Sequence, residues 1–144
     1  MPKVRPSRFV RLLAAVAVGV TAVAALPAVS AQAATASFNE SVRGGYNDTQ
    51  PLGNATGTVT RTGSASASYS VTLCGQNTYP SSRVVIQGGT ASVNHIVYYQ
   101  DCETFSGTFA SSSAFAFVTI TVSGSTFYPG NQYTTYTKTA TRYI

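Results

Sequence analysis

The stretch SASASYSVTLC, residues 64–74, alternates small or apolar side chains with hydroxyl side chains along its whole length. Successive side chains of a β-strand point to opposite faces, so this alternation predicts a strand with one face in a core and the other toward water. The inward row would consist of Ala65, Ala67, Tyr69, Val71 and Leu73.

Six further strands are predicted near residues 37–43, 55–62, 83–87, 90–100, 108–123 and 132–142, where Val, Thr, Tyr and Phe concentrate. Turn signals separate them: Gly88-Gly89 predicts a tight hairpin and Pro129-Gly130-Asn131 a type II turn. Helix formers are scarce, with two Leu after residue 33. About seven short strands predict an antiparallel β-sandwich with Greek-key, immunoglobulin-like connections, and a small closed β-barrel is the alternative.

Residues 1–33 are interpreted as a cleaved secretory signal peptide. A positive start precedes an uncharged stretch at 12–29, and Ala31-Gln32-Ala33 suits cleavage before Ala34. The cations of that start are Lys3, Arg5, Arg8 and Arg11. We therefore expect a secreted, extracellular protein with one domain over residues 34–144 and no membrane attachment after cleavage. A retained membrane anchor is the alternative.

The charge balance changes when the leader is set aside. The whole chain has nine Lys and Arg against four Asp and Glu, but residues 34–144 keep five against four, a net charge of +1. No basic cluster remains to neutralise a row of phosphates, so nucleic acid is not an expected partner.

Two cysteines, Cys74 and Cys102, are predicted to form a disulfide, because an exported pair reaches an oxidising compartment. Closing the loop between them would stabilise the fold by roughly 3.5 kcal/mol in the chain-entropy description.

The stretch NHIVYYQDCETF, residues 94–105, holds the polar residues with the most chemistry: His95, Asp101 and Glu103. Alternation places His95 in the more apolar row of its strand, which predicts a partly buried, hydrogen-bonded histidine. Asp101 to Glu103 would form the strand end and the first loop residues. A hydrolase that uses His95 or the two acids is the functional alternative.

Zinc needs three or four His or Cys ligands, and one histidine remains once the thiols are paired. No G-x-S-x-G stretch accompanies the histidine, and no Trp is present for sugar stacking. We therefore expect no metal, no cofactor and no catalytic activity.

Aromatic side chains supply the candidate binding residues. Phe115 and Phe117 lie opposite the apolar row of Val118, Ile120 and Val122, so they would be exposed if that row faces the core. Burial on both faces of the strand is the alternative. Exposed rings mark binding surfaces, and a loop with an aromatic at each end suits rigid contact. The candidate contacts are Phe115, Phe117, Tyr98, Tyr128 and Tyr133.

Threonine recurs at every other position in 56–62, 119–121 and 135–141. The ordinary interpretation is the solvent face of a sandwich, where Thr pairs across strands. On neighbouring strands such rows would form a flat hydroxyl array, which could match an ordered lattice such as ice or a polysaccharide.

The sequence therefore predicts an extracellular, non-catalytic binding module whose partner is an unidentified protein or carbohydrate. An inhibitor of an extracellular hydrolase is the alternative, with Gln76 to Ser82 as its contact loop because the disulfide would hold one end. A small secreted hydrolase is the third possibility.

Overall fold

A computed structural model of the chain describes residues 33–76, 81–128 and 132–144. The interpretation of residues 1–33 as a leader lies outside these ranges except at Ala33. The same holds for the turn at 129–131 and for the middle of the loop from Gln76 to Ser82. In the part of the chain that is described, no helix is long and apolar enough to cross a membrane.

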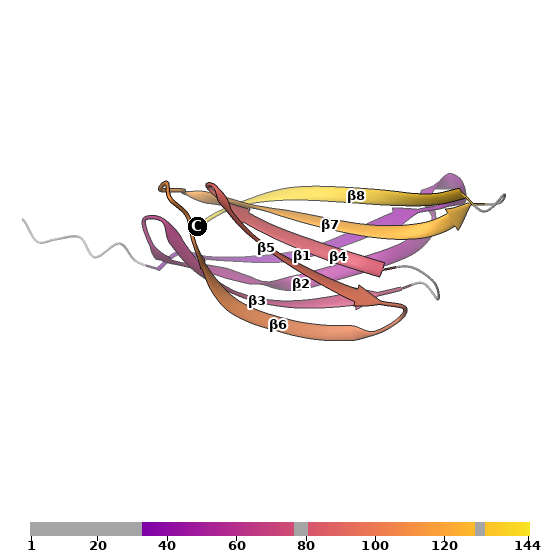
Figure 1. The fold of residues 1–144 in the computed structure, drawn as a ribbon, viewed down its shortest axis with the longest axis horizontal. Coiled ribbons are helices and arrows are strands. Elements are labelled where there is room, and N and C mark those ends of the chain that lie inside the picture. The colour runs from indigo at the N-terminus through magenta and orange to yellow at the C-terminus, as the bar shows by residue number, and fades with distance from the viewer. Residues whose placement is uncertain (1–32, 77–80, 129–131) are drawn as a thin grey trace, which may run out of the picture.

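Eight strands and one short 3-10 helix make up the fold (Figure 1). In chain order they are β1 (Thr35–Gly44), η1 (Tyr46–Asp48), β2 (Gln50–Gly63), β3 (Ser66–Gly75), β4 (Ser81–Gly88), β5 (Ala91–Tyr98), β6 (Cys102–Ala110), β7 (Phe117–Tyr128) and β8 (Gln132–Tyr143).

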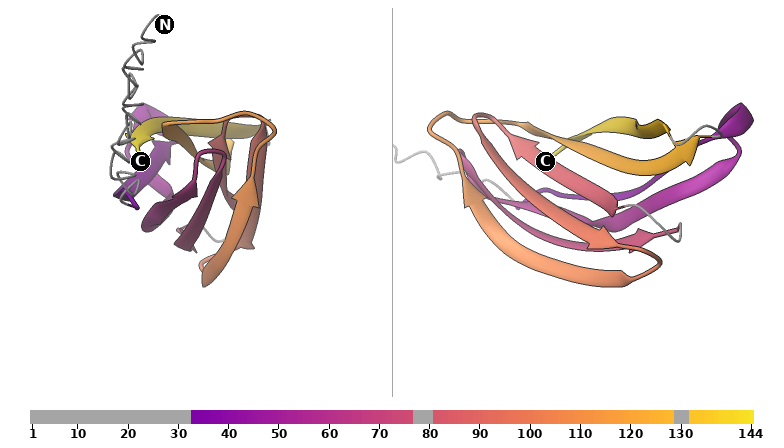
Figure 2. Two further views of the ribbon diagram at one scale, coloured as in Figure 1. Left: turned by 90° about the vertical axis from the view of Figure 1, so that its left-hand side faces the viewer. Right: turned by 45° about the vertical axis from the view of Figure 1, so that its right-hand side comes forward.

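The strands form two antiparallel sheets of four, which are stacked as a sandwich (Figure 2). Sheet A has the order β1-β2-β3-β6, and sheet B has the order β5-β4-β7-β8. The chain crosses from sheet A to the β4–β5 hairpin in sheet B, returns to place β6 beside β3, and crosses again to place β7 beside β4. This is the predicted sandwich rather than the closed barrel, because no strand of one sheet pairs with a strand of the other among the described residues.

The core comes from the inward rows of both sheets. Val71 and Leu73 of β3 face Val84 and Ile86 of β4 across the sandwich, and all four have no exposed surface. Each such side chain contributes on the order of 2 kcal/mol to folding. The alternation at 64–74 therefore predicted the core face of β3 correctly, with Tyr69 half-buried at its edge.

The hairpin predicted at Gly88-Gly89 is confirmed. Gly88 pairs with Ala91, so Gly89 and Thr90 form a two-residue loop, and Gly89 has the positive φ of 57° that glycine tolerates.

The stretch 108–123, predicted as one strand, is two strands, which raises the count from seven to eight. β6 ends at Ala110, and residues 111–116 carry the chain from sheet A to sheet B. Ser111 interrupts the ladder because its hydroxyl accepts hydrogen bonds from the backbone N–H groups of Thr90 (2.9 Å) and Ser113 (3.1 Å). Cys102 and Glu103, predicted at a strand end and in a loop, instead begin β6.

Candidate functional site

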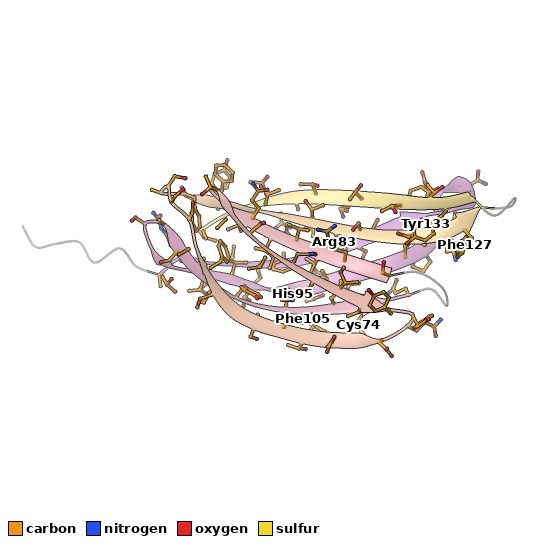
Figure 3. The ribbon with its side chains drawn as sticks, viewed as in Figure 1. Cys74, Arg83, His95, Phe105, Phe127 and Tyr133 are labelled. Carbon is orange, nitrogen blue, oxygen red and sulfur yellow. A yellow bond between two sulfur atoms is a disulfide. The ribbon has the colours of Figure 1, made fainter. Side chains whose placement is uncertain are left out.

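His95 lies between the two sheets at the edge formed by β5 and β6 (Figure 3). Its Nε2 shares a hydrogen bond of 2.9 Å with the hydroxyl of Tyr69 on β3. Its ring stacks on Phe105 of β6, with centroids 4.2 Å apart and planes 13° apart. The histidine is therefore half-buried and hydrogen-bonded inside the sandwich, as the alternation along its strand predicts.

Burial lowers the pKa of His95 below its ordinary 6.5, because a charged imidazolium loses solvation there, and the negative charge of Glu103 raises it in part. His95 belongs to sheet B, whereas Tyr69 and Phe105 belong to sheet A. The hydrogen bond and the ring stacking of its neutral imidazole therefore join the two sheets.

The two acids near His95 do not form a compact site with it. Asp101 is exposed in the turn after β5, and its backbone carbonyl accepts a hydrogen bond of 2.9 Å from the N–H of Gly75. Glu103 is exposed on β6 and acts on His95 through its charge. Within the described ranges, no three His, Cys, Asp or Glu side chains gather closely enough to hold a metal ion.

The predicted disulfide joins Cys74 to Cys102. The two residues are direct partners on β3 and β6, so the bridge lies across two neighbouring strands of sheet A. The exposed turn that follows β5 ends at this bridge.

Tyr98 ends β5 and Tyr99 begins that turn, and they are 60% and 57% exposed. Tyr99 has φ 59°, a left-handed conformation that is uncommon for a tyrosine and costs on the order of 1 kcal/mol. The close approach of β3 holds this backbone in place: a Cβ on Gly75 would lie 1.9 Å from the carbonyl oxygen of Tyr99. Two adjacent tyrosines are thus presented on a braced turn.

The exposed large apolar side chains of the described residues all belong to sheet B or to the turn that leaves it. They are Ile96, Tyr98, Tyr99, Phe117, Phe127, Tyr133 and Tyr143. Strand alternation and the register place Ile96 and Tyr98 on the outer face of β5, and the Phe and other Tyr residues on the outer faces of β7 and β8. We call this outer surface of sheet B face B, and the outer surface of sheet A face A.

Phe115, a candidate contact if it were exposed beside Phe117, does not lie on this surface. Phe115 precedes β7 and is 7% exposed, because it stacks on Phe109 of β6 with ring centroids 5.8 Å apart. Phe117, two residues later, is 49% exposed. Tyr98 lies far from it, since Tyr98 pairs with Ser81 at the start of β4 whereas Phe117 lies beyond the other end of that strand.

Face B has a regular pattern along β7 and β8. The outward cross-strand pairs are Phe117 with Tyr143, Thr119 with Thr141, Thr121 with Thr139, Ser123 with Thr137, Ser125 with Thr135, and Phe127 with Tyr133. An aromatic pair therefore stands at each end of four hydroxyl pairs, and in the pair beside Phe127 and Tyr133 the Ser125 side chain is only 5% exposed. We call these six pairs the β7–β8 ladder. Tyr128, another predicted contact, ends β7 and pairs with Gln132.

Face A carries hydroxyls, and none of the exposed aromatic side chains of the described residues lies on it. Its registered rows across β1, β2, β3 and β6 are Thr35, Thr60, Ser68 and Thr108; Ser37, Thr58, Ser70 and Ser106; and Asn39, Thr56, Thr72 and Thr104. The next row ends in the disulfide. The alternating threonines thus do lie on neighbouring strands, where Thr35 bonds Thr60 and Thr72 bonds Thr104, both at 2.8 Å.

Sequence reasoning missed Glu40, which is 4% exposed. It lies in the inward row of β1 between Phe38 and Val42, and its carboxylate pairs with Arg142 and with Lys138 (3.1 Å) of β8. A carboxylate in an otherwise apolar row was the available signal. Charges that point inward at an edge protect exposed strands from pairing with other chains, and this trio closes the β1/β8 edge.

Comparison of the chain with protein-family models, with curated proteins and with solved structures gave no significant match.

Proposed function

We propose that the protein is an extracellular, non-catalytic binding module that contacts its partner through face B. One observation carries the proposal: the exposed large apolar side chains of the described residues gather on one side of the sandwich. Exposed aromatic side chains that gather on one surface favour a binding role, because they bury much area at low conformational cost.

The hydrogen-bonded, stacked environment of His95 supports a structural rather than a catalytic role. The competing hydrolase hypothesis predicts that His95→Ala or Glu103→Gln abolishes turnover of a substrate. Unchanged turnover in both variants would remove it.

The proposal is tested with immobilised polysaccharides and immobilised secreted proteases and amylases. Wild-type protein is compared with a triple variant, Tyr98→Ser, Tyr133→Ser and Tyr143→Ser, whose positions are all more than half exposed. We expect binding to one of these classes and its loss in the triple variant. A matched triple on face A, Thr58→Ala, Ser70→Ala and Ser106→Ala, should bind as the wild type does. Binding that survives the face B triple would contradict the proposal.

A second function, inhibition of an extracellular hydrolase, is favoured by the braced turn at Tyr98 and Tyr99. Rigid inhibitor loops bind tightly because little order is lost on docking. The loop expected for this role, Gln76 to Ser82, falls partly outside the described residues. The turn after β5 is held by the same disulfide, because Asp101 precedes Cys102 and accepts a hydrogen bond from Gly75, which follows Cys74. An unchanged activity of every protease and amylase in a broad panel would exclude inhibition.

A further inference from the structure

The β7–β8 ladder has an arrangement opposite to that of an ordinary protein interface. Protein interfaces place apolar anchors at the centre and polar groups at the rim. Here the apolar rings stand at the two ends, and Thr and Ser occupy the middle. A partner that suits this arrangement must offer the same apolar feature at two separated places and hydrogen-bonding groups between them.

Both ends of the ladder present ring surface to solvent. Phe117 and Tyr143 meet at 6.1 Å and 64°, and Phe127 and Tyr133 meet at 5.5 Å and 66°. In these edge-to-face pairs the four side chains stay between 49% and 79% exposed. Figure 3 shows Phe127 and Tyr133 together where β7 and β8 meet. Such rings can stack on the C–H face of a sugar.

The middle of the ladder is neutral and made of hydroxyls. Thr121 and Thr139 bond each other at 3.1 Å, and hydroxyl groups can both donate to and accept from a sugar hydroxyl. Lys138 and Arg142, the cations of β8, pair with Glu40 at the sandwich edge instead of joining this row. Arg83 of β4, the register partner of Ser123, is an exposed cation beside the ladder and donates to Asn94. A polyanion would therefore find one cation next to the ladder and not a row of them.

The ladder is long enough for a polymer. Phe117 and Phe127 are ten residues apart on one strand, which corresponds to roughly 33 Å at the usual rise of a strand. A linear polysaccharide repeats one apolar and hydroxylated unit along such a length, so it can meet both aromatic pairs and the hydroxyls between them.

A hollow lies at the Phe117 end of the ladder. It has a volume of about 410 Å³, and its lining includes Gln87, Phe115, Phe117 and Thr119. An amide, a hydroxyl and two rings are the groups that would hold one sugar unit, such as a chain end or a branch.

From this geometry we propose that the β7–β8 ladder binds a neutral, extended polysaccharide, with one sugar face on each aromatic pair and the chain along the hydroxyls. The inference rests on the proposed function and names its partner class.

The test measures binding of the purified protein to xylan, glucomannan, β-1,3-glucan, cellulose and chitin, with polygalacturonate as the charged comparator. At least one neutral polymer should bind and polygalacturonate should not. Tyr133→Ala and Tyr143→Ala should each weaken binding at least about fivefold, as expected for anchoring rings. Thr121→Val with Thr139→Val should weaken it about threefold, because two hydroxyls that meet the sugar are lost.

The matched control is Thr72→Val with Thr104→Val, which removes the corresponding hydroxyl pair from face A. It should bind within twofold of the wild type. The dependence of affinity on polymer length is a second measure. Only a long chain reaches both aromatic pairs, so its affinity should exceed that of a short chain. A disaccharide of the same sugar should bind at two sites per protein molecule, one at each aromatic pair, and Tyr143→Ala should reduce the number of sites to one.

The inference is overturned if no neutral polymer binds, if polygalacturonate binds equally, or if the ladder variants bind as the control does. Binding to a secreted protein alone, lost in the face B triple variant, would overturn the inference and leave the proposed function standing. Self-association of the wild type that Tyr143→Ala abolishes would mean that a second copy occupies the ladder, and it would overturn the inference as well.

Discussion

The two outer faces of the sandwich share their hydroxyl chemistry and differ in what is added to it. Face A is a registered array of Ser, Thr and Asn that ends at a disulfide. Face B has the same kind of hydroxyl pairs on β7 and β8, with exposed rings added at both ends. Cross-strand hydroxyl pairs contribute modestly and similarly to any sheet.

The threonine rows are therefore explained by their place on a solvent-facing sheet surface, and no ligand is needed to account for them. The rings are different, because an exposed Phe or Tyr gives little to folding while it adds apolar surface. The side with the rings is the side where function is expected, and the side with the disulfide is the side that reinforces the fold. The following predictions test that division, from the largest expected effect to the smallest.

The largest effect should separate two phenylalanines that are two residues apart. Phe115→Ala removes a ring that is 7% exposed and stacked on Phe109, so it should lower the free energy of unfolding by about 3–5 kcal/mol. Phe117→Ala, on face B, should cost less than about 1 kcal/mol. Urea unfolding of both variants measures this difference. Equal losses would show that Phe117 belongs to the core and would break the division between fold and face.

The disulfide of face A should come next. Cys74→Ser with Cys102→Ser should lower the free energy of unfolding by about 3.5 kcal/mol, because the closed loop spans a sequence separation of 28 residues. Guanidinium unfolding of the double variant and of reduced wild-type protein should give matching midpoints. A double variant as stable as the oxidised protein would mean that the strand pairing of β3 and β6 holds that end of sheet A without the bridge.

The cations of β8 pair with Glu40 at the β1/β8 edge, and removing them should have an intermediate effect on the free energy of unfolding. Arg142→Ala leaves Glu40 buried with Lys138 alone, so we expect a loss of about 2 kcal/mol. Lys138→Ala should cost less than about 1 kcal/mol, because the lysine is 53% exposed.

Arg83→Ala is the control for this edge, because it removes an exposed cation that donates to Asn94 at 2.6 Å on face B. It should change stability by less than about 0.5 kcal/mol. Thermal unfolding of the three variants gives the order. A loss in Arg83→Ala as large as that in Arg142→Ala would show that the buried carboxylate gives the edge no special role.

The sequence predicted much of this division, since period-two alternation specifies the two faces of each strand. It predicted the disulfide, the Gly88-Gly89 hairpin and the burial of His95, because each follows from neighbouring residues. It could not place Phe115, because alternation continues through residues 111–116 while the backbone leaves the sheet. The serine hydrogen bonds that end β6 involve Thr90, which is distant in sequence.

The pairs of the β7–β8 ladder could have been predicted from the sequence, and the unusual position of Glu40 could have been predicted in part. β7 and β8 pair so that each residue of β7 is matched with the residue of β8 that is equally far in sequence from position 130. That rule would have matched Phe117 with Tyr143 and Phe127 with Tyr133. The partners of Glu40 lie about a hundred residues away on β8, and only the stacking of the two sheets brings them together.

The smallest effect concerns His95, which belongs to neither face. Its folded-state pKa lies below the ordinary 6.5, mainly through burial, so the unfolded chain binds the proton more readily. Stability should therefore be fully present above about pH 6.5 and fall as the pH decreases from there toward the folded-state pKa. His95→Gln should remove this part of the pH dependence. Glu103→Gln should enlarge it, because the charge that raises the pKa is gone. Urea midpoints at pH 7.5, 6.5 and 5.5 measure the slopes, and parallel slopes in wild type and His95→Gln would show that the histidine has the same proton affinity in the sandwich as in the unfolded chain.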